Sequence, residues 1–313
     1  MERIILIETS TALCSTALAE NGEIVSYRES SAPKAHASLT AVFIQEMLAE
    51  RDLSLSDCDA ICVSKGPGSY TGLRVGVSTA KGLCFGSGKP LLAVGTLDTL
   101  VAQASAERLS DSFAYHPELP ACLPDSSACH LDSSCHPERS EGSPFRFIIP
   151  MIDARRMEVY TAVFTTSDLN GVSLLSDDSA ATPSASTAIP SEAIVIPGEA
   201  IVIPSEAIVI PSEGEGSTHY TQTTETAPMI IDENSFAEYL EQGSCLFIGD
   251  GAGKCADVIK HPNARFCQCQ PKASSMLEPA LAAFRAGDFK DVAYFEPFYL
   301  KEFVATVSKK KLW

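Results

Sequence analysis

A glycine-rich stretch, KGPGSYTGLRVGVSTAKGL (residues 65–83), follows the apolar run AICVS (60–64) and constrains the fold more than any other feature. The apolar run predicts a buried strand, and the stretch after it predicts a turn followed by a helix. Such a turn leaves backbone N–H groups at a helix start, where a phosphate could bind. Alternatively the turn is structural. Unusual backbone angles would then be supplied by Gly66, Gly68 and Gly72, and the helix would be capped by Ser69 or Thr71. The local sequence favours the structural interpretation, because a lone glycine-rich turn is a weak signal.

Composition excludes several classes of protein. Forty acidic against twenty-three basic side chains among 313 residues give a formal charge of -17, which disfavours nucleic-acid binding by this chain alone. The apolar run near the start, Ile4 to Ile7, is too short for a signal sequence or a membrane span. Eleven cysteines without a secretory signal indicate reduced thiols in a cytoplasm. We therefore expect a cytoplasmic protein with no membrane contact, which meets RNA only through a partner.

Two β/α series along the chain predict an α/β protein with two related lobes. Residues 3–29 alternate strand-like runs with turns, and Asn21-Gly22 indicates a hairpin. Over 36–51 apolar residues recur at three-to-four spacing, which predicts an amphipathic helix. With the strand and helix at 60–83 and a further strand, PLLAVGT, the order is β-β-β-α-β-α-β. A similar, shorter series returns later and ends in a helix near 276–286.

Two segments interrupt this pattern. Residues 108–145 form an irregular insert, and residues 183–217 carry a low-complexity repeat with a period of seven residues. Because a proline opens every unit, the period is not that of a coiled coil, and we expect exposed turn or coil without a catalytic role. The predicted domains are an N-terminal lobe at 1–107 and a C-terminal lobe at 146–313 that carries the repeat.

Motifs with known chemistry are incomplete. Four residues of the types that bind zinc lie within eight positions: Cys129, His130, Cys135 and His136. Structural zinc sites normally use two separated pairs of ligands, so this spacing argues against a zinc site. GDGAGKC (249–255) resembles the end of a P-loop, yet Ile248 replaces the first glycine and Cys255 replaces the magnesium-binding hydroxyl. No Ser/His/Asp or Cys/His set is discernible. Asp153, Arg155 and Glu158 fit either a salt-linked hairpin or a functional site.

Four motifs stand in a specific order: ILIETSTALCSTAL, KGPGSYTGLRVGVSTAKGL, MIDARRMEVYTAVF and EPFYLKEF. Together they resemble the bacterial TsaB (YeaZ) family, the accessory subunit that makes threonylcarbamoyladenosine in tRNA. The resemblance covers most of residues 1–105, residues 146–164 and the C-terminal tail, and leaves both inserts outside. It implies a two-lobed fold of the actin and Hsp70 ATPase type with a duplicated βββαβα unit.

The family is homologous to TsaD, the catalytic subunit, which binds metal through a His-x-x-x-His pair. The resemblance places those two positions on Thr96 and Leu100, which cannot act as histidine ligands, and His36 is followed four residues later by Thr40. It therefore implies a noncatalytic subunit that holds no cofactor or metal tightly, with ATP and metal on the TsaD and TsaE partners. A metal-dependent glycoprotease-like peptidase and an autonomous actin-like ATPase are the alternatives.

The resemblance also implies where a partner binds. The helix after the glycine turn and the helix before it are expected to form a face toward TsaD, made by Leu39, Phe43, Met47, Tyr70, Gly72, Arg74, Gly76 and Ala80. Small residues there would let another backbone approach closely. A second group is expected between the lobes or near a nucleotide, namely Gly66, Gly68, Ser69, Asp153, Arg155 and Glu158.

The expected partners are TsaD directly, TsaE and tRNA through the complex, and a second copy when the chain is alone. The C-terminal KKKLW is interpreted as a solvated charged end, with tRNA contact left open.

Overall fold

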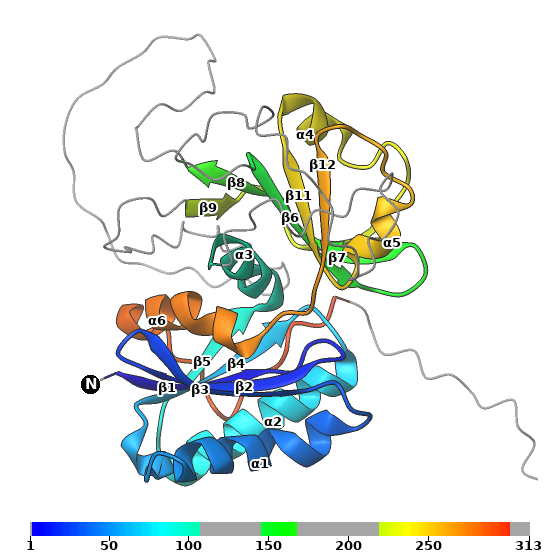
Figure 1. Ribbon diagram of the computed structural model, residues 1–313. Coiled ribbons are helices and arrows are strands. Elements are labelled where there is room, and N and C mark those ends of the chain that lie inside the picture. Colours follow the sequence, from blue (N-terminus) through cyan, green and yellow to red (C-terminus); the bar gives the residue numbers. More distant parts are fainter. Residues whose placement is uncertain (1, 107–144, 168–218, 301–313) are drawn as a thin grey trace, which may run out of the picture.

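A computed structural model of the chain describes residues 2–106, 145–167 and 219–300, which form two lobes (Figure 1). The cysteine and histidine group at 129–136, the repeat at 183–217 and the C-terminal KKKLW lie outside the described residues. Within them, no helix combines the length and the apolar character needed to cross a membrane.

The N-terminal lobe is built on a five-stranded sheet with the order β3-β2-β1-β4-β5. Its strands are β1 (Arg3–Glu8), β2 (Cys14–Glu20), β3 (Glu23–Ser30), β4 (Ala60–Gly66) and β5 (Leu91–Gly95). The first three pair antiparallel, and β4 and β5 extend the sheet in parallel from β1. The predicted hairpin is confirmed, because Asn21 and Gly22 take φ values of 52° and 87° between β2 and β3.

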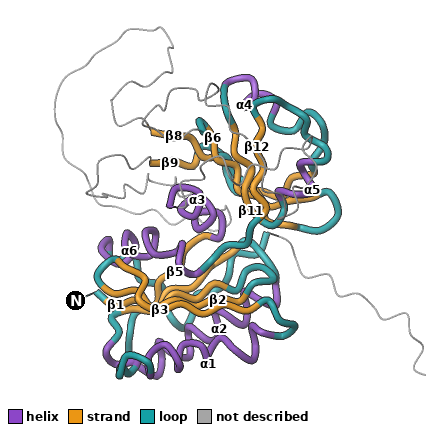
Figure 2. The backbone as a smooth tube through the Cα atoms, viewed as in Figure 1, coloured by secondary structure: helices purple, strands orange, loops and turns teal. Residues whose placement is uncertain are grey.

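Helices cover both faces of this sheet (Figure 2). α1 (Ala35–Ala49) and α2 (Tyr70–Ser87) lie on one face, with the short η1 (Leu55–Asp57) between them in the chain. Their shared core contains Ile5, Ile7, Ile44, Met47, Val63, Val77 and Ala80. The other face is covered by η3 (Ala273–Met276) and α6 (Leu277–Ala286), which bury Ile4, Leu6, Ala17, Cys62 and Leu92. Burial on both faces explains why β1 and β4 read as continuous apolar runs.

The C-terminal lobe contains a seven-stranded sheet whose main path is β10-β7-β6-β11-β12. Its strands are β6 (Phe147–Asp153), β7 (Glu158–Thr161), β8 (Phe164–Ser167), β9 (His219–Gln222), β10 (Ala227–Ile230), β11 (Cys245–Gly249) and β12 (Ala264–Gln268). β6, β7 and β10 pair antiparallel, whereas β11 and β12 extend the sheet in parallel. Two short helices, α4 (Ala237–Gln242) and α5 (Ala252–Ala256), complete the lobe.

The chain crosses between the lobes twice, so the predicted boundaries at 1–107 and 146–313 are wrong in detail. α3 (Thr96–Ala106) packs Leu97, Leu100 and Val101 against the C-terminal sheet. In return, residues 273–300 leave the C-terminal lobe and pack on the N-terminal sheet. Periodicity identifies a helix and its apolar side, but it does not say which sheet the helix covers.

This exchange predicts that residues 1–95 do not fold alone. Without η3 and α6, the apolar face of the sheet is exposed to water, which costs roughly 25 cal/mol for each Å². We expect no cooperative thermal transition in near-UV circular dichroism, and we expect binding of a hydrophobic dye. The same fragment joined to residues 273–300 by a flexible linker should regain the transition. A cooperative transition in the fragment alone would show that the second face needs no cover.

Candidate functional site

The start of α2 is fixed by the turn that precedes it. The Ser69 side chain accepts a hydrogen bond from the Gly72 N–H at 3.4 Å, and the Ser69 N–H donates to the Ser10 carbonyl at 2.6 Å. The helix ends at Gly88, which takes the left-handed conformation with φ 70°. Capping by Ser69 is therefore confirmed, and the turn is bonded to the chain between β1 and β2.

The glycines let α2 approach its own sheet. A Cβ on Gly68 would lie 2.3 Å from the Ser10 carbonyl oxygen, and one on Gly72 would lie 2.0 Å from that of Thr9. On Gly76 it would lie 2.2 Å from the Thr9 hydroxyl oxygen. No side chain fits at such distances, so the close approach of α2 to Thr9 and Ser10 explains all three glycines. Of the three glycines expected to supply unusual backbone angles, only Gly66 has a positive φ, of 103°, so that expectation is wrong for Gly68 and Gly72. A nucleotide near Gly66, Gly68 and Ser69 stays a prediction.

Four residues expected in the partner interface point inward. Met47 is 1% exposed, and Ala80 is fully buried in the core beneath α1 and α2. Gly72 and Gly76 face Thr9. The expectation that these four residues meet another subunit is wrong, because Met47 and Ala80 pack in the lobe's own core and the two glycines accommodate its own β1–β2 connection. Arg74 is exposed, and Leu39, Phe43 and Tyr70 are half-buried.

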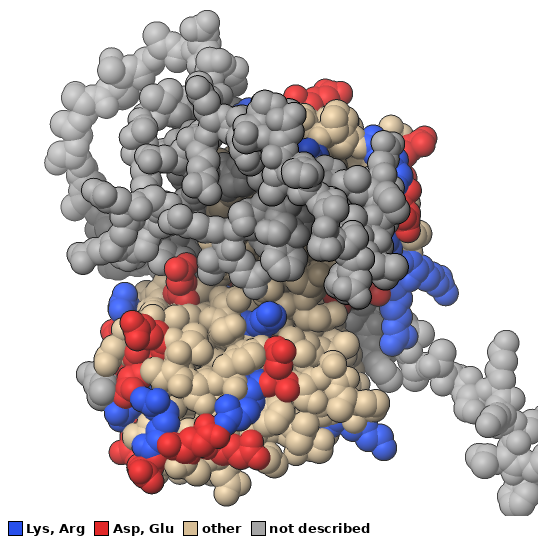
Figure 3. Space-filling model, in the orientation of Figure 1, with Lys and Arg blue, Asp and Glu red and all other residues tan. Residues whose placement is uncertain are grey.

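A different set of residues forms what we call the outward face of α1 and α2. On α1 it comprises Ala37, Ala41 and Val42, and on α2 it comprises Thr71, Val75, Ser78, Gly82 and Phe85. Phe85 is 87% exposed, and no atom lies within 4 Å of a Cβ built on Gly82. Beside this face, Arg28 pairs with Glu46 at 3.9 Å and also with Glu50, and Figure 3 shows charges of both signs on the N-terminal lobe.

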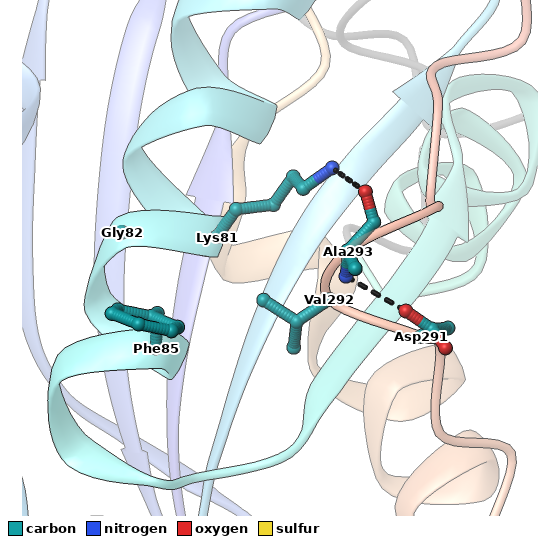
Figure 4. A pocket seen from close by; sticks show the side chains of 6 residues that line it. All are labelled: Lys81, Gly82, Phe85, Asp291, Val292 and Ala293. Carbon is teal, nitrogen blue, oxygen red and sulfur yellow. Dashed lines mark hydrogen bonds between the residues drawn. The ribbon is translucent and has the colours of Figure 1, made fainter.

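Beside Phe85, α2 and the C-terminal segment (residues 287–300) enclose an apolar groove of about 570 Å³ (Figure 4). It is lined by Lys81, Gly82, Phe85, Asp291, Val292 and Ala293. The Lys81 ammonium donates to the carbonyl oxygens of Ala293 at 3.0 Å and Phe295 at 3.1 Å. These bonds hold the segment against α2 and leave the Phe85 ring standing out from the helix.

Sequence reasoning misses a buried polar cluster at the end of β1. Glu8 is fully buried, and its Oε1 accepts a hydrogen bond from the Ser10 N–H at 2.7 Å. Its Oε2 has no hydrogen-bond partner among the described residues, nor have the hydroxyls of Thr9, Ser10 and Thr11. Burial raises the pKa of the Glu8 carboxyl, and hydrogen bonds from Ser10 oppose that shift. The signal in the sequence is one acid and three hydroxyl residues directly after an apolar strand.

In the C-terminal lobe, Lys254 of the P-loop-like sequence bonds to its own chain. Its ammonium lies 2.5 Å from the Asp153 carboxylate and also donates to the carbonyls of Arg156 and Glu158. An ammonium has three protons, so these contacts use all of them. Asp250 accepts from the Asp153 N–H at 2.8 Å, and burial raises the pKa of Asp250 to about 6.

The hairpin interpretation of Asp153, Arg155 and Glu158 fits the structure. Arg155 and Arg156 form the turn between β6 and β7 with φ values of 71° and 55°. The ion pair of Asp153 is with Lys254 and not with Arg155, whose N–H donates to the Asp153 carboxylate at 2.8 Å.

The two positions that correspond to the metal-binding histidines of TsaD carry buried, packed side chains. Thr96 and Leu100 are both fully buried at the start of α3, and Leu100 packs among Ile148, Ile152 and Ile248. Across residues 2–106, 145–167 and 219–300, no group of three or more His, Cys, Asp or Glu side chains is placed to hold a metal ion.

The packing of α2 yields a prediction with a matched control. Gly72→Ala and Gly76→Ala should each lower the free energy of unfolding by about 1–3 kcal/mol, because the new methyl overlaps Thr9. Gly82→Ala should raise it by up to about 1 kcal/mol, since the position is open and alanine favours helix. Urea unfolding followed by circular dichroism measures all three. Neutral effects at positions 72 and 76 would contradict the close contact.

Glu8 yields a prediction about pH. Its raised pKa means that the folded chain holds this proton more tightly than the unfolded chain does. The stability this group contributes is therefore present below the unfolded pKa and is lost as pH rises through the folded pKa. Glu8→Gln keeps an acceptor for the Ser10 N–H but does not titrate. The difference in unfolding free energy between variant and wild type should grow with pH above about 4.3. If the unfolding free energies of variant and wild type changed with pH in parallel, the prediction would be wrong.

Comparison with known proteins relates the chain to one tRNA-modification system. The sequence profile of the tRNA N6-adenosine threonylcarbamoyltransferase (TsaD) family matches residues 28–130. The tRNA threonylcarbamoyladenosine biosynthesis protein TsaB of Escherichia coli is 36% identical over 102 residues, covering 33% of this chain and 44% of that protein. The TsaB of Haemophilus influenzae is 39% identical over 104 residues, covering 33% and 43%. The chain thus matches less than half the length of either relative.

The fold has a solved counterpart. YeaZ from Pseudomonas aeruginosa superposes with a TM-score of 0.61 at 20% identity, covering 96% of this chain and 100% of that one. At this identity the likeness shows the shared fold. The chain is thus similar in sequence to TsaB proteins over about its N-terminal third, and similar in fold to YeaZ.

Proposed function

We propose that this chain is a noncatalytic subunit required to form threonylcarbamoyladenosine at the adenosine next to the anticodon, in tRNAs that read codons starting with A. It binds and activates a TsaD-type transferase. A TsaE-type ATPase and tRNA join through the complex, ATP and metal are held by the partners, and the free chain forms a homodimer in the cytoplasm. The observation that carries this proposal is the match of the N-terminal lobe to proteins named for threonylcarbamoyladenosine biosynthesis.

The order of strands supports a duplicated fold of the actin and Hsp70 type. In each lobe three strands pair antiparallel, and two later strands extend the sheet in parallel from the first of them. In this proposal the duplicated fold serves as a scaffold and has no catalytic activity. The filled positions at Thr96 and Leu100 and the self-bonded Lys254 support the absence of catalysis.

The outward face of α1 and α2 is the proposed contact with TsaD. Residues without long side chains, among them Ala37, Ala41, Ser78 and Gly82, let a partner helix approach closely. The 87%-exposed Phe85 provides an aromatic anchor beside the groove, the kind of residue that dominates binding energy at interfaces. This face replaces the inward-pointing residues that the sequence suggested.

Gly82→Arg tests this contact. The position is open in the free subunit, so the fold should keep its melting temperature. In the complex, a buried guanidinium without a partner costs several kcal/mol, and copurification with the cognate TsaD should be lost. Ala237→Arg, on the exposed surface of α4, is the matched control and should copurify as the wild type does. A folded Gly82→Arg variant that binds TsaD normally would place the contact elsewhere.

The function itself is tested by the wild-type chain. It should copurify with the cognate TsaD and support formation of the modified nucleoside in tRNA. Failure of both would overturn the proposal. A peptidase or an autonomous ATPase would instead gain about 2.7 kcal/mol of stability from metal or ATP at a hundred times the dissociation constant.

A further inference from the structure

A second groove lies on the C-terminal lobe, away from α1 and α2, and we call it the α4 groove. It has a volume of about 500 Å³ and is formed by the end of β7, the chain before and within β10, and the start of α4. Figure 1 shows α4 at the end of this lobe that is far from the N-terminal lobe. The lining residues that matter for its chemistry are Thr161, Val163, Glu225, Met229, Phe236 and Glu238.

Hydrogen bonds and packing hold the walls of the α4 groove in place. The Val163 N–H donates to the Thr224 hydroxyl at 2.8 Å, and the Val163 carbonyl accepts from the Thr223 N–H at 2.8 Å. These bonds join the chain after β7 to the chain before β10. On the other wall, the Phe236 ring is 8% exposed and packs edge-on against Phe247, with ring centroids 5.6 Å apart. Fixed walls reduce the entropy that is lost when a ligand binds.

One buried residue that lines the groove has a polar atom without a partner. Thr161 is 4% exposed, and its hydroxyl forms no hydrogen bond among the described residues. Side chains alternate along β7, so Thr161 lies on the same side of the sheet as Val159, which packs in the core with Phe236, and opposite to Tyr160. That side is the one where the groove lies. A buried hydroxyl without a hydrogen bond is unfavourable, so a ligand that bonds to it gains affinity.

The rim of the α4 groove is acidic. Glu225 and Glu238 line it, both are exposed, and neither forms an ion pair with a described basic side chain. Of the residues that the structure describes, no lysine, arginine or histidine lines the groove. Burial, together with Glu238, raises the pKa of the Tyr239 hydroxyl, which keeps this lining group neutral. The rim therefore attracts a positive charge.

These features specify one chemical class of ligand. The carboxylates suit a cation, the walls made by Val163, Met229 and Phe236 suit an apolar body, and the Thr161 hydroxyl suits a hydrogen-bonding group at the inner end. We propose that the α4 groove is a binding site for a small organic ammonium compound with an apolar body. The site goes beyond the proposed function, because it lies on the other lobe from the proposed contact with TsaD.

A peptide that pairs with β10 as a further strand fits this site less well. β10 is at the edge of its sheet. The Ile231 N–H donates to the Met157 carbonyl at 2.9 Å, and N–H groups alternate in direction along an antiparallel strand, so position 228 faces the free edge. Pro228 has no N–H to donate there, and proline at an edge opposes strand pairing. The geometry therefore favours a small molecule over an added strand.

NMR titration of the isotope-labelled full-length chain with tyramine, phenethylamine and phenylpropionate tests the proposal. All three have a phenyl body, the two amines are cationic at neutral pH, and tyramine adds a hydroxyl at the far end from its ammonium group. Both amines should cause saturable chemical-shift changes in residues 161–163 and 224–239, whereas the phenylpropionate anion should cause none at the same concentration. Tyramine should bind about two- to tenfold more tightly than phenethylamine, because its hydroxyl bonds to Thr161.

Thr161→Val separates a role in ligand binding from a structural role. The variant removes a hydroxyl that has no partner, so its melting temperature should equal or exceed that of the wild type. Its affinities for tyramine and phenethylamine should be equal. The proposal is overturned if the variant keeps the preference for tyramine, or if neither amine causes saturable shifts at the groove of the wild type.

Charge variants test the acidic rim. Glu225→Gln and Glu238→Gln should each weaken binding of both amines by about 1.5- to 5-fold, the effect expected for an exposed ion pair. Glu241→Gln is the matched control, because Glu241 is exposed on the same helix but does not line the groove. It should bind both amines as the wild type does. Equal amine binding by all three variants and the wild type would contradict recognition of the ammonium group by the rim.

Discussion

The close contact between α2 and the β1–β2 connection determines much of the rest of the N-terminal lobe. Gly72 and Gly76 bring the helix axis so near to Thr9 that no side chain fits between them. That contact fixes the rotation of α2 about its axis, and the rotation decides which residues face outward. Glu8, directly before Thr9, is buried together with the hydroxyl residues that follow it. The glycines thus have an indirect role in the proposed contact with TsaD, because they orient the residues on the other side of the helix.

The exchange of segments between lobes is a second constraint. α3 belongs by sequence to the first lobe but packs on the second sheet, and residues 273–300 return to the first. The N-terminal lobe therefore completes its core with residues 273–300, which follow it in the chain. The C-terminal lobe completes its core with α3, which precedes it. The returning segment also places Val292 beside α2 and Tyr299 against Tyr70. The groove beside Phe85 depends on this segment, although the segment is far from α2 in sequence.

Sequence reasoning succeeds where local chemistry decides the structure. The hairpin at Asn21-Gly22, the cap at Ser69 and the helix after it depend on neighbouring residues and are correctly predicted. It fails for Met47, Gly76 and Ala80, because their orientation depends on contacts with β1 that are distant in sequence. Small residues on a helix are equally suited to an internal and an external neighbour. The pairing of Tyr70 with Tyr299 spans more than two hundred residues, and no periodicity in the sequence indicates it.

The geometry of α2 keeps its functions apart. Gly72, Gly76 and Ala80 repeat every four residues and face the sheet, whereas Val75, Ser78, Gly82 and Phe85 lie on the opposite side at spacings of three and four. Along the axis, Tyr70 and Phe85 are separated by about 22 Å, given a rise of about 1.5 Å per residue. That separation is more than twice the screening length of about 8 Å at physiological salt, so a charge at one end has little effect at the other. The helix therefore holds the lobe together through one side and leaves Phe85 exposed on the other, at the end far from Tyr70.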